Sequence, residues 1–211
     1  MAVLGRASLA LAGAAAAYLL LLRERCLTWG ASPEEVSREM PGDDLIPDPD
    51  TLATRAITID APPSATWPWL VQMGSGRGGA YTYDWIENLF GLGMHSADEI
   101  LPEFQGLSEG DVLPLGRSGP GMRVEILRPE RFLAFRLETG TWVWIFGLYR
   151  EDGSTRLVSR NRISAPRAGV LGRLFNTLFM EPGSLVMERK MLIGIKERAE
   201  RLARLHDRSG P

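Results

Sequence analysis

The sequence has little of what disulfides and metal centres require. Its 211 residues contain one cysteine, Cys26, and two histidines, His95 and His206. A single cysteine cannot form an internal disulfide, and Cys26 has no neighbouring base that would activate it as a nucleophile. The two histidines are too far apart in the chain to form a metal-binding motif with each other or with the cysteine. We therefore expect no metal site.

A large excess of one charge is also missing. The chain has 24 Lys and Arg residues against 26 Asp and Glu residues, which gives a net charge of −2. Because nucleic-acid-binding domains carry clusters of positive charge, no nucleic-acid partner is expected. Hydrophobic residues make up 45% of the chain, which is enough for the core of one globular domain.

One long uncharged run stands apart, the segment ASLALAGAAAAYLLLL at residues 7–22. With the apolar residues before it, this run approaches the roughly 20 residues that cross a bilayer. We predict a single-pass transmembrane anchor over residues 1–23; a cleaved signal peptide and a buried helix are the alternatives. Arg23, Arg25 and Arg38 follow the run, which favours a cell-membrane protein with its domain on the cytoplasmic side.

Residues 24–52 are predicted to be a linker that carries one short helix. The capping box from Ser32 to Glu35 marks the start of this helix. The prolines and aspartates that follow it are typical of a semi-rigid spacer. The folded domain is expected over residues 53–205, followed by a disordered tail at 206–211.

Two periodicities organise the expected domain. After a first strand at 54–60, hydrophobic residues alternate in five short segments that turn signals separate. These segments are DVLPLG, GMRVEILRP, RFLAFRLE, TWVWIFGLYRE and TRLVSRNRIS, between residues 111 and 164. Their short connections predict antiparallel neighbours. Hydrophobic residues then recur at helical spacing over 183–205, which predicts a long helix covering one face of the sheet.

Five stretches carry a resemblance to a known family. They are MPGDDLIPDP, APPSATWPWLVQMGSGRGGAYTYDWIEN, HSADEILPE, GDVLPLG and MERKMLIGIKERAE. With them the chain resembles the START/Bet v 1-like (SRPBCC) superfamily, specifically a bacterial branch described as polyketide cyclase/dehydrase-like. The resemblance implies an α+β helix-grip fold, in which a curved antiparallel β-sheet wraps around a long C-terminal helix. It also implies a cavity between them, since members bind hydrophobic small molecules or lipids and some are cyclases or aromatases.

Gly74, Gly76 and Gly79 spell G-x-G-x-x-G, the pattern of a dinucleotide-binding loop. That loop follows a strand, whereas the segment PSATWPWLVQM before these glycines is helical and no parallel βαβ unit follows. We interpret the glycines as a hinge between two helices. An anion site that uses Arg77 and free backbone N–H groups is the alternative. No cofactor is expected.

The segment TWVWIFGLY is apolar on both faces of its predicted strand. Either another segment covers the outer face, or the indole rings line a ligand cavity. The next strand places two polar side chains, Ser159 and Asn161, on its inner face, while Arg156, Arg160 and Arg162 are expected to face water. The predicted ligand-binding residues are Tyr83, Trp85, Trp142, Trp144, Phe146, Ser159, Asn161, Leu192 and Ile195.

The segment VLGRLFNTLFM has a hydrophobic stripe at helical spacing. It is either a helix that packs in the core or an amphipathic lid that rests on lipid and admits a ligand.

No catalytic residue is assigned, although His95, Asp84 and Glu87 could serve in acid–base chemistry. A structural hydrogen bond is the simpler role for His95, and acids on a helix are ordinarily exposed. Three functional hypotheses follow. The chain is a membrane-anchored module that binds a hydrophobic small molecule or lipid, a cyclase/dehydratase-type enzyme for a polyketide-like substrate, or an interaction protein whose cavity is filled.

Overall fold

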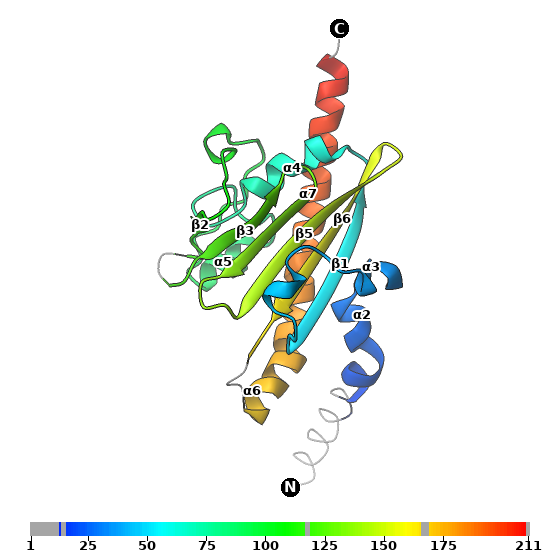
Figure 1. Cartoon of the computed structure of the whole chain (residues 1–211), viewed down its shortest axis with the longest axis vertical. Helices are drawn as coiled ribbons and strands as arrows, with labels where there is room; N and C mark the ends of the chain where they lie inside the picture. Colours follow the sequence, from blue (N-terminus) through cyan, green and yellow to red (C-terminus); the bar gives the residue numbers. More distant parts are fainter. Residues whose placement is uncertain (1–12, 14–15, 117–118, 166–168, 210–211) are drawn as a thin grey trace.

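The structure, a computed structural model, describes residues 13, 16–116, 119–165 and 169–209. Within this part of the chain, six antiparallel strands form one sheet in the order β1-β6-β5-β4-β3-β2 (Figure 1). The strands are β1 (Thr51–Ile59), β2 (Val112–Leu113), β3 (Met122–Arg128), β4 (Phe132–Leu137), β5 (Trp142–Glu151) and β6 (Ser154–Ile163). The alternation in the sequence therefore predicted the meander from β2 to β6 correctly, and β1 adds to its β6 edge.

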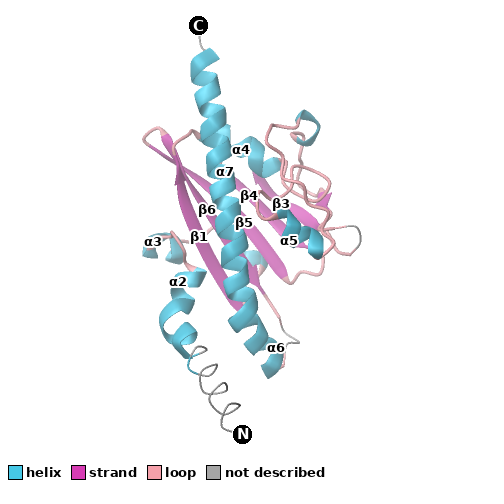
Figure 2. Cartoon of the chain, turned by 180° about the vertical axis from the view of Figure 1, so that it is seen from behind, coloured by secondary structure: helices cyan, strands magenta, loops and turns pink. Residues whose placement is uncertain are grey.

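The long C-terminal helix α7 (Glu181–Ser209) runs along one face of the sheet, as Figure 2 shows. On that inner face Phe146 and Leu157 pack with Leu192 and Ile195 of α7, and Trp69 of α4 joins the same core. This is the helix-grip arrangement. The other helices are α2 (Arg23–Leu27), α3 (Pro33–Ser37), α4 (Pro63–Val71), α5 (Asp84–Leu89), α6 (Val170–Phe175), and the short turns η1 (Tyr18–Leu22), η2 (Asp43–Leu45), η3 (Pro102–Phe104) and η4 (Asn176–Met180).

Residues 31–47 cover the outer face of the sheet (Figure 1). Met40 and Ile46 are buried there against Val143 and Ile145 of β5. The capping box of α3 is present as expected. This part of the predicted linker is nevertheless not a free spacer, because its apolar side chains complete a second core. The coverage also explains why β5 is apolar on both faces.

The prediction that three arginines of β6 face water is wrong, because the covering segment supplies their partners. Arg156 donates to both carboxylate oxygens of Glu35, at 2.7 and 2.8 Å. Arg160 and Arg162 both pair with Asp43, at 2.6 and 3.2 Å, and donate to backbone carbonyls of the same segment. These charge-assisted hydrogen bonds attach residues 31–47 to the sheet.

Most of the predicted anchor lies outside the described residues. Its last turn, η1, continues into α2, and Arg23 ties this N-terminal region to Glu181 at the start of α7 through two bonds of 2.8 Å. Among the residues described, none of the helices is both long and apolar enough to span a bilayer. The predicted disordered tail is wrong for residues 206–209, because α7 continues to Ser209.

Candidate functional site

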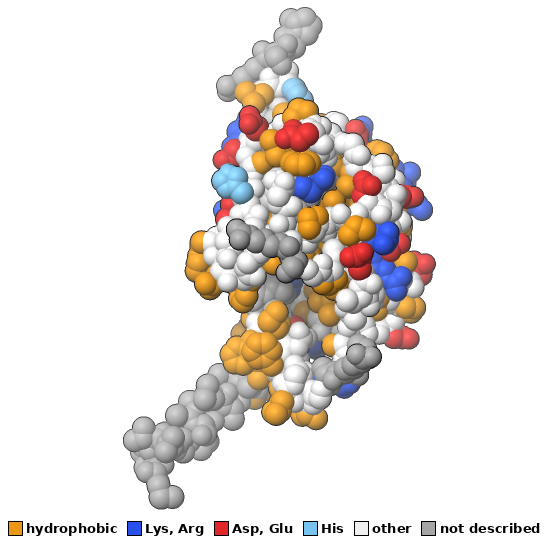
Figure 3. Space-filling view, turned by 90° about the vertical axis from the view of Figure 1, so that its left-hand side faces the viewer, with side chains coloured by type: hydrophobic (Ala, Val, Ile, Leu, Met, Phe, Trp, Pro, Cys, Tyr) orange, Lys and Arg blue, Asp and Glu red, His pale blue; other side chains and the backbone are white. Residues whose placement is uncertain are grey.

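A cavity of about 480 Å³ lies between the inner face of the sheet and the first turns of α7. Strands β1, β5 and β6 form one wall, α7 forms the opposite wall, and the segment from Ala80 to Met94 closes a third side. Its surface is mainly apolar, with Trp142, Trp144, Met187 and Met191 among the lining residues. Figure 3 shows a hollow in the face of the molecule, with hydrophobic side chains gathered around it.

The two indole rings of β5 are the largest apolar groups on the cavity wall. Trp142 and Trp144 stack with ring centroids 5.5 Å apart. Their indole N–H groups donate within the protein, from Trp142 to Asn161 Oδ1 at 2.8 Å and from Trp144 to Ser159 Oγ at 2.9 Å. Because the polar edges already have partners, the rings offer apolar surface to the cavity.

A buried ion pair joins the two walls of the cavity. Arg55 of β1 donates to Glu188 of α7, and also to Ser184 Oγ at 3.0 Å. The Glu188 carboxylate further accepts from Ser159 Oγ at 2.6 Å and from Asn161 Nδ2 at 3.1 Å. Burial raises the pKa of Glu188, while the charge of Arg55 and the hydrogen bonds act in the opposite direction.

Glu87 brings a second carboxyl to the same cavity, from α5. Its exposed fraction is only 7%, and both Glu87 and Thr82 line the cavity. In the described part of the chain, Glu87 Oε2 and Thr82 Oγ1 are buried without a hydrogen-bond partner. Burial raises the pKa of the Glu87 carboxyl above its ordinary value, the neighbouring Thr82 hydroxyl acts in the opposite direction, and the charge of Asp84 adds to the rise. Neutral carboxylic acid is therefore favoured here more than at an ordinary glutamate.

The other two acid–base candidates do not line this cavity. Asp84 accepts hydrogen bonds from the backbone N–H of Ser96 at 2.8 Å and from its hydroxyl at 2.6 Å, a structural role. The side chain of His95 is 95% exposed and lies 4.0 Å from Asp84. Of the three candidates, the fold brings only Glu87 to the cavity wall.

The predicted ligand-binding residues fall into three groups. Trp142, Trp144 and Asn161 line the cavity, and Ser159 lies directly behind this wall through its bonds to Trp144 and Glu188. Three residues, Phe146, Leu192 and Ile195, are instead fully buried in the adjoining core. Two others, Tyr83 and Trp85, lie at the surface, and Trp85 is 71% exposed.

Sequence reasoning missed the pair Arg55 and Glu188. The signal was a charge on an otherwise apolar face, because Arg55 shares the inner face of β1 with Ile57 and Ile59. Similarly, Glu188 belongs to the buried stripe of α7 that contains Met191 and Leu192. Charged residues are almost never fully buried unless they are paired. A positive charge on the inner face of β1 and a negative charge on the buried face of α7 therefore indicate an ion pair between them.

The glycine segment is a tight reversal, as expected. Gly74 and Gly79 exchange backbone hydrogen bonds of 2.9 and 3.1 Å, and both have positive φ. A Cβ at Gly79 would lie 2.6 Å from the carbonyl oxygen of His95, so no side chain fits there. Arg77 donates to the carbonyls of Val71 and Phe104 and therefore does not support the alternative of an anion site.

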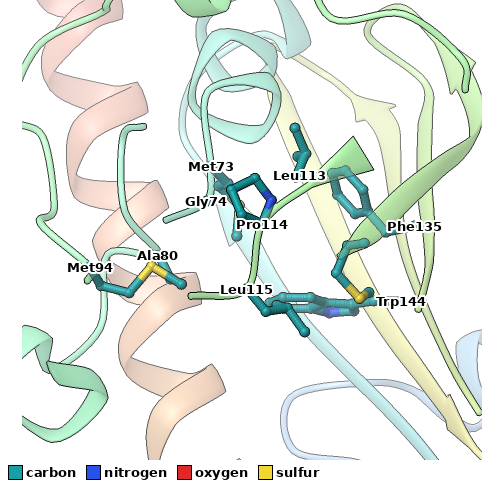
Figure 4. A pocket seen from close by; sticks show the side chains of 10 residues that line it. Met73, Gly74, Ala80, Met94, Leu113, Pro114, Leu115, Phe135 and Trp144 are labelled. Atoms are coloured by element: carbon teal, nitrogen blue, oxygen red, sulfur yellow. The ribbon is translucent and has the colours of Figure 1, made fainter. Parts of the chain in front are cut away.

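A smaller recess of about 50 Å³ borders the cavity (Figure 4). Its wall is apolar and includes Met73, Leu113 and Phe135, and it shares Ala80, Met94, Leu115 and Trp144 with the larger cavity. Trp144 thus lines both apolar spaces.

Hydrophobic side chains are exposed on α6 and η4, next to the larger cavity. On α6 and η4, Leu171, Phe175 and Phe179 are exposed, and the two phenyl rings stack at 5.5 Å. Of the two alternatives for this segment, the core-packing helix is therefore wrong for α6, which has no buried residue. Met180, at the end of η4, lines the cavity. Helices α6 and η1 lie at the same end of the molecule (Figures 1 and 2), and the leucines of η1 are exposed as well.

Comparison with known proteins gives structural likeness only. No family model matches this chain, and no curated protein matches it. Similar solved structures include the Polyketide_cyc-like protein Cgl2372 from Corynebacterium glutamicum, which is 16% identical with a TM-score of 0.35, covering 74% of this chain and 91% of that one. The KanY protein is 15% identical with a TM-score of 0.47, covering 71% and 97%. Protein MLL2253 from Mesorhizobium loti is 15% identical with a TM-score of 0.42, covering 76% and 100%. Polyketide cyclase-like proteins are thus among the structural neighbours.

Proposed function

We propose that this chain is a binding module that holds a hydrophobic small molecule or lipid in the cavity between the sheet and α7. The observation that carries the proposal is the cavity of about 480 Å³ whose wall presents the faces of Trp142 and Trp144. Apolar pockets with a few polar groups are the usual form of small-molecule sites. Each Å² of apolar ligand surface that leaves water contributes about 25 cal/mol.

The charged groups on the wall are compatible with an apolar ligand. Arg55 and Glu188 neutralise each other, and Ser159 and Asn161 complete the hydrogen bonds of the carboxylate. The ion pair therefore makes this part of the wall polar, and it does not need a charged ligand group to balance it.

We further propose that the chain works at the cell membrane, with its domain on the cytoplasmic side. Two features support the membrane location: the apolar segment at residues 7–22 of the sequence, and the exposed hydrophobic side chains of α6 and η4 beside the cavity. The arginines that follow the apolar segment, Arg23, Arg25 and Arg38, favour the cytoplasmic side. Amphipathic helices of this kind bury their apolar face in the interface of a bilayer. A ligand could then pass between lipid and cavity without crossing water.

The direct test is binding of the neutral dye N-phenyl-1-naphthylamine to the full chain. Ala53 is buried on the cavity wall, so Ala53→Phe should fill the space and abolish the fluorescence increase. Val112 is exposed on β2 and lines neither cavity, so Val112→Phe is the matched control and should bind like wild type. Equal dye binding by the two variants would reject the proposed site. Native mass spectrometry with lipid extraction would then identify any ligand that copurifies.

A cyclase/dehydratase-type enzyme is the second candidate, because Glu87 places a carboxyl of raised pKa on the cavity wall. Proton transfer to a bound polyketide-like chain requires a general acid that keeps its proton closer to neutral pH than an ordinary glutamate does, and the raised pKa of Glu87 is a change in that direction. Turnover of such a substrate that is lost in Glu87→Gln, with dye binding retained, would favour this function. The third hypothesis, an interaction protein with a filled interior, receives no support from an open cavity.

A further inference from the structure

Two residues that line the cavity each have a buried side-chain oxygen without a hydrogen bond of ordinary length and angle in the described part of the chain. They are Thr82 Oγ1 and Glu87 Oε2, and the Thr82 hydroxyl lies close enough to the Glu87 carboxyl to lower its pKa. A buried polar atom without a partner costs about 1–3 kcal/mol, so such atoms are rare and usually meet a ligand or an ordered water. Both of these atoms belong to residues that line the same cavity.

The remaining polar groups of the cavity are already bonded within the protein. Asn161 accepts from Trp142 and donates to Glu188, and Arg55 donates to the backbone carbonyl of Cys26 and to the side chains of Ser184 and Glu188. Among the described residues that line the cavity, only Thr82 and Glu87 leave a buried side-chain oxygen without a partner. The buried side-chain oxygens without a hydrogen-bond partner therefore both belong to the segment from Thr82 to Glu87.

The charge of this place favours an uncharged group. No cationic side chain forms an ion pair with Glu87 within the described ranges, and the charge of Asp84 raises the pKa of its carboxyl. An anionic ligand group would thus find no counter-ion here. When it carries its proton, the Glu87 carboxyl has one O–H donor and a carbonyl acceptor, and the hydroxyl of Thr82 can donate and accept. Together they match a hydroxyl or carbonyl group.

We infer that Thr82 and Glu87 form the polar subsite of this cavity, and that its ligand is an uncharged amphipathic molecule. The ligand places a hydroxyl or carbonyl group at this subsite and its apolar body against Trp142 and Trp144. This inference rests on the proposed binding function and names the ligand class for it.

The experiment compares three matched competitors, naphthalene, 2-naphthol and 2-naphthoate, in displacing N-phenyl-1-naphthylamine from the full chain at neutral pH. Wild type should bind 2-naphthol about tenfold more tightly than naphthalene, as one hydrogen bond to a buried polar group implies. It should bind 2-naphthoate more weakly than 2-naphthol. Glu87→Leu should lose the preference for naphthol and keep its affinity for the dye within about twofold. In Glu87→Gln the preference should survive, because an amide also donates and accepts.

The control is Glu99→Leu, which removes an exposed acid outside the cavity and should leave all three affinities unchanged. Should Glu87→Leu fail to fold, Thr82→Val reports on the same subsite and should reduce the naphthol preference.

The two proposals fail in different ways. Absence of dye binding to wild type rejects the binding function itself. Dye binding without a naphthol preference, or with a preference that survives in Glu87→Leu and Thr82→Val, rejects only the subsite. Tighter binding of 2-naphthoate than of 2-naphthol would also reject it.

Discussion

Arg55 of β1 and Glu188 of α7 form an ion pair that is almost completely removed from water, with side-chain exposures of 1% and 6%. The pair links the edge strand of the sheet to the helix, and both of its residues line the cavity. Burial of two charges is tolerated only because each has further partners, Cys26 and Ser184 for the arginine and Ser159 and Asn161 for the glutamate.

Replacing one member of this pair should be much more harmful than replacing both. Arg55→Met leaves the Glu188 carboxylate buried and without its counter-ion, so we expect the free energy of unfolding to fall by about 3–5 kcal/mol. The double variant Arg55→Met with Glu188→Leu removes both charges and should recover most of this loss. Urea unfolding followed by circular dichroism measures all three proteins. A double variant as unstable as the single one would show that the pair is not the source of the stability.

Arg160 should hold the covering segment on the outer face of the sheet. Its guanidinium donates to Asp43, Thr54 and the carbonyls of residues 35, 36 and 38. Arg160→Met leaves these acceptors buried without a hydrogen-bond donor, so we expect a loss of about 3 kcal/mol in the free energy of unfolding. Limited proteolysis should also cut residues 31–47 earlier than in wild type. Arg150, exposed on β5, provides the matched control, and Arg150→Met should change neither measurement.

The sequence predicted the parts of the fold that have a regular period. Alternation located strands β2 to β6, and the helical stripe located α7, because each element buries one face against the other. The covering segment has no period, and its attachment to the sheet depends on arginine partners 115 or more positions away, such as Pro47 with Arg162. A prediction from the local sequence pattern could not detect these distant partners, and it therefore placed the side chains of Arg156, Arg160 and Arg162 in water.

The sequence could predict which face of each element borders the candidate site. It could not predict which positions along that face line the cavity. Periodicity correctly placed Trp142, Trp144 and Asn161 on the inner face. It could not tell that Phe146 and Leu192, on the same faces, lie where the helix has already closed onto the sheet. Where a cavity ends depends on how the helix crosses the sheet, which is a property of the assembled fold.

The exposed face of α6 should contribute to membrane binding. Phe175 is exposed and stacks on Phe179, so Phe175→Glu places a charge where the proposal puts lipid. We expect partitioning into phosphatidylcholine vesicles with phosphatidylglycerol to weaken about tenfold, since burial of such a side chain contributes about 1.5–3 kcal/mol. Cosedimentation of the full chain measures it. Val112→Glu introduces the same charge on β2 and should leave partitioning unchanged; equal loss in both variants would argue against a specific face.

Glu87 should make the stability of the protein fall as pH rises. Its pKa is raised in the folded state by burial, so as pH rises past the ordinary glutamate value of 4.5 the folded protein keeps this proton longer than the unfolded chain does. The folded state then binds more protons than the unfolded state, and linkage requires the free energy of unfolding to decrease with increasing pH through that window. Glu87→Gln cannot lose a proton, so its stability should exceed that of wild type at pH 7 and match it more closely at pH 4. Urea unfolding of the two proteins between pH 4 and pH 8 measures the difference. Two parallel curves would show that Glu87 ionises in the folded protein as it does in the unfolded chain, which would remove the physical basis for a neutral carboxyl on the cavity wall.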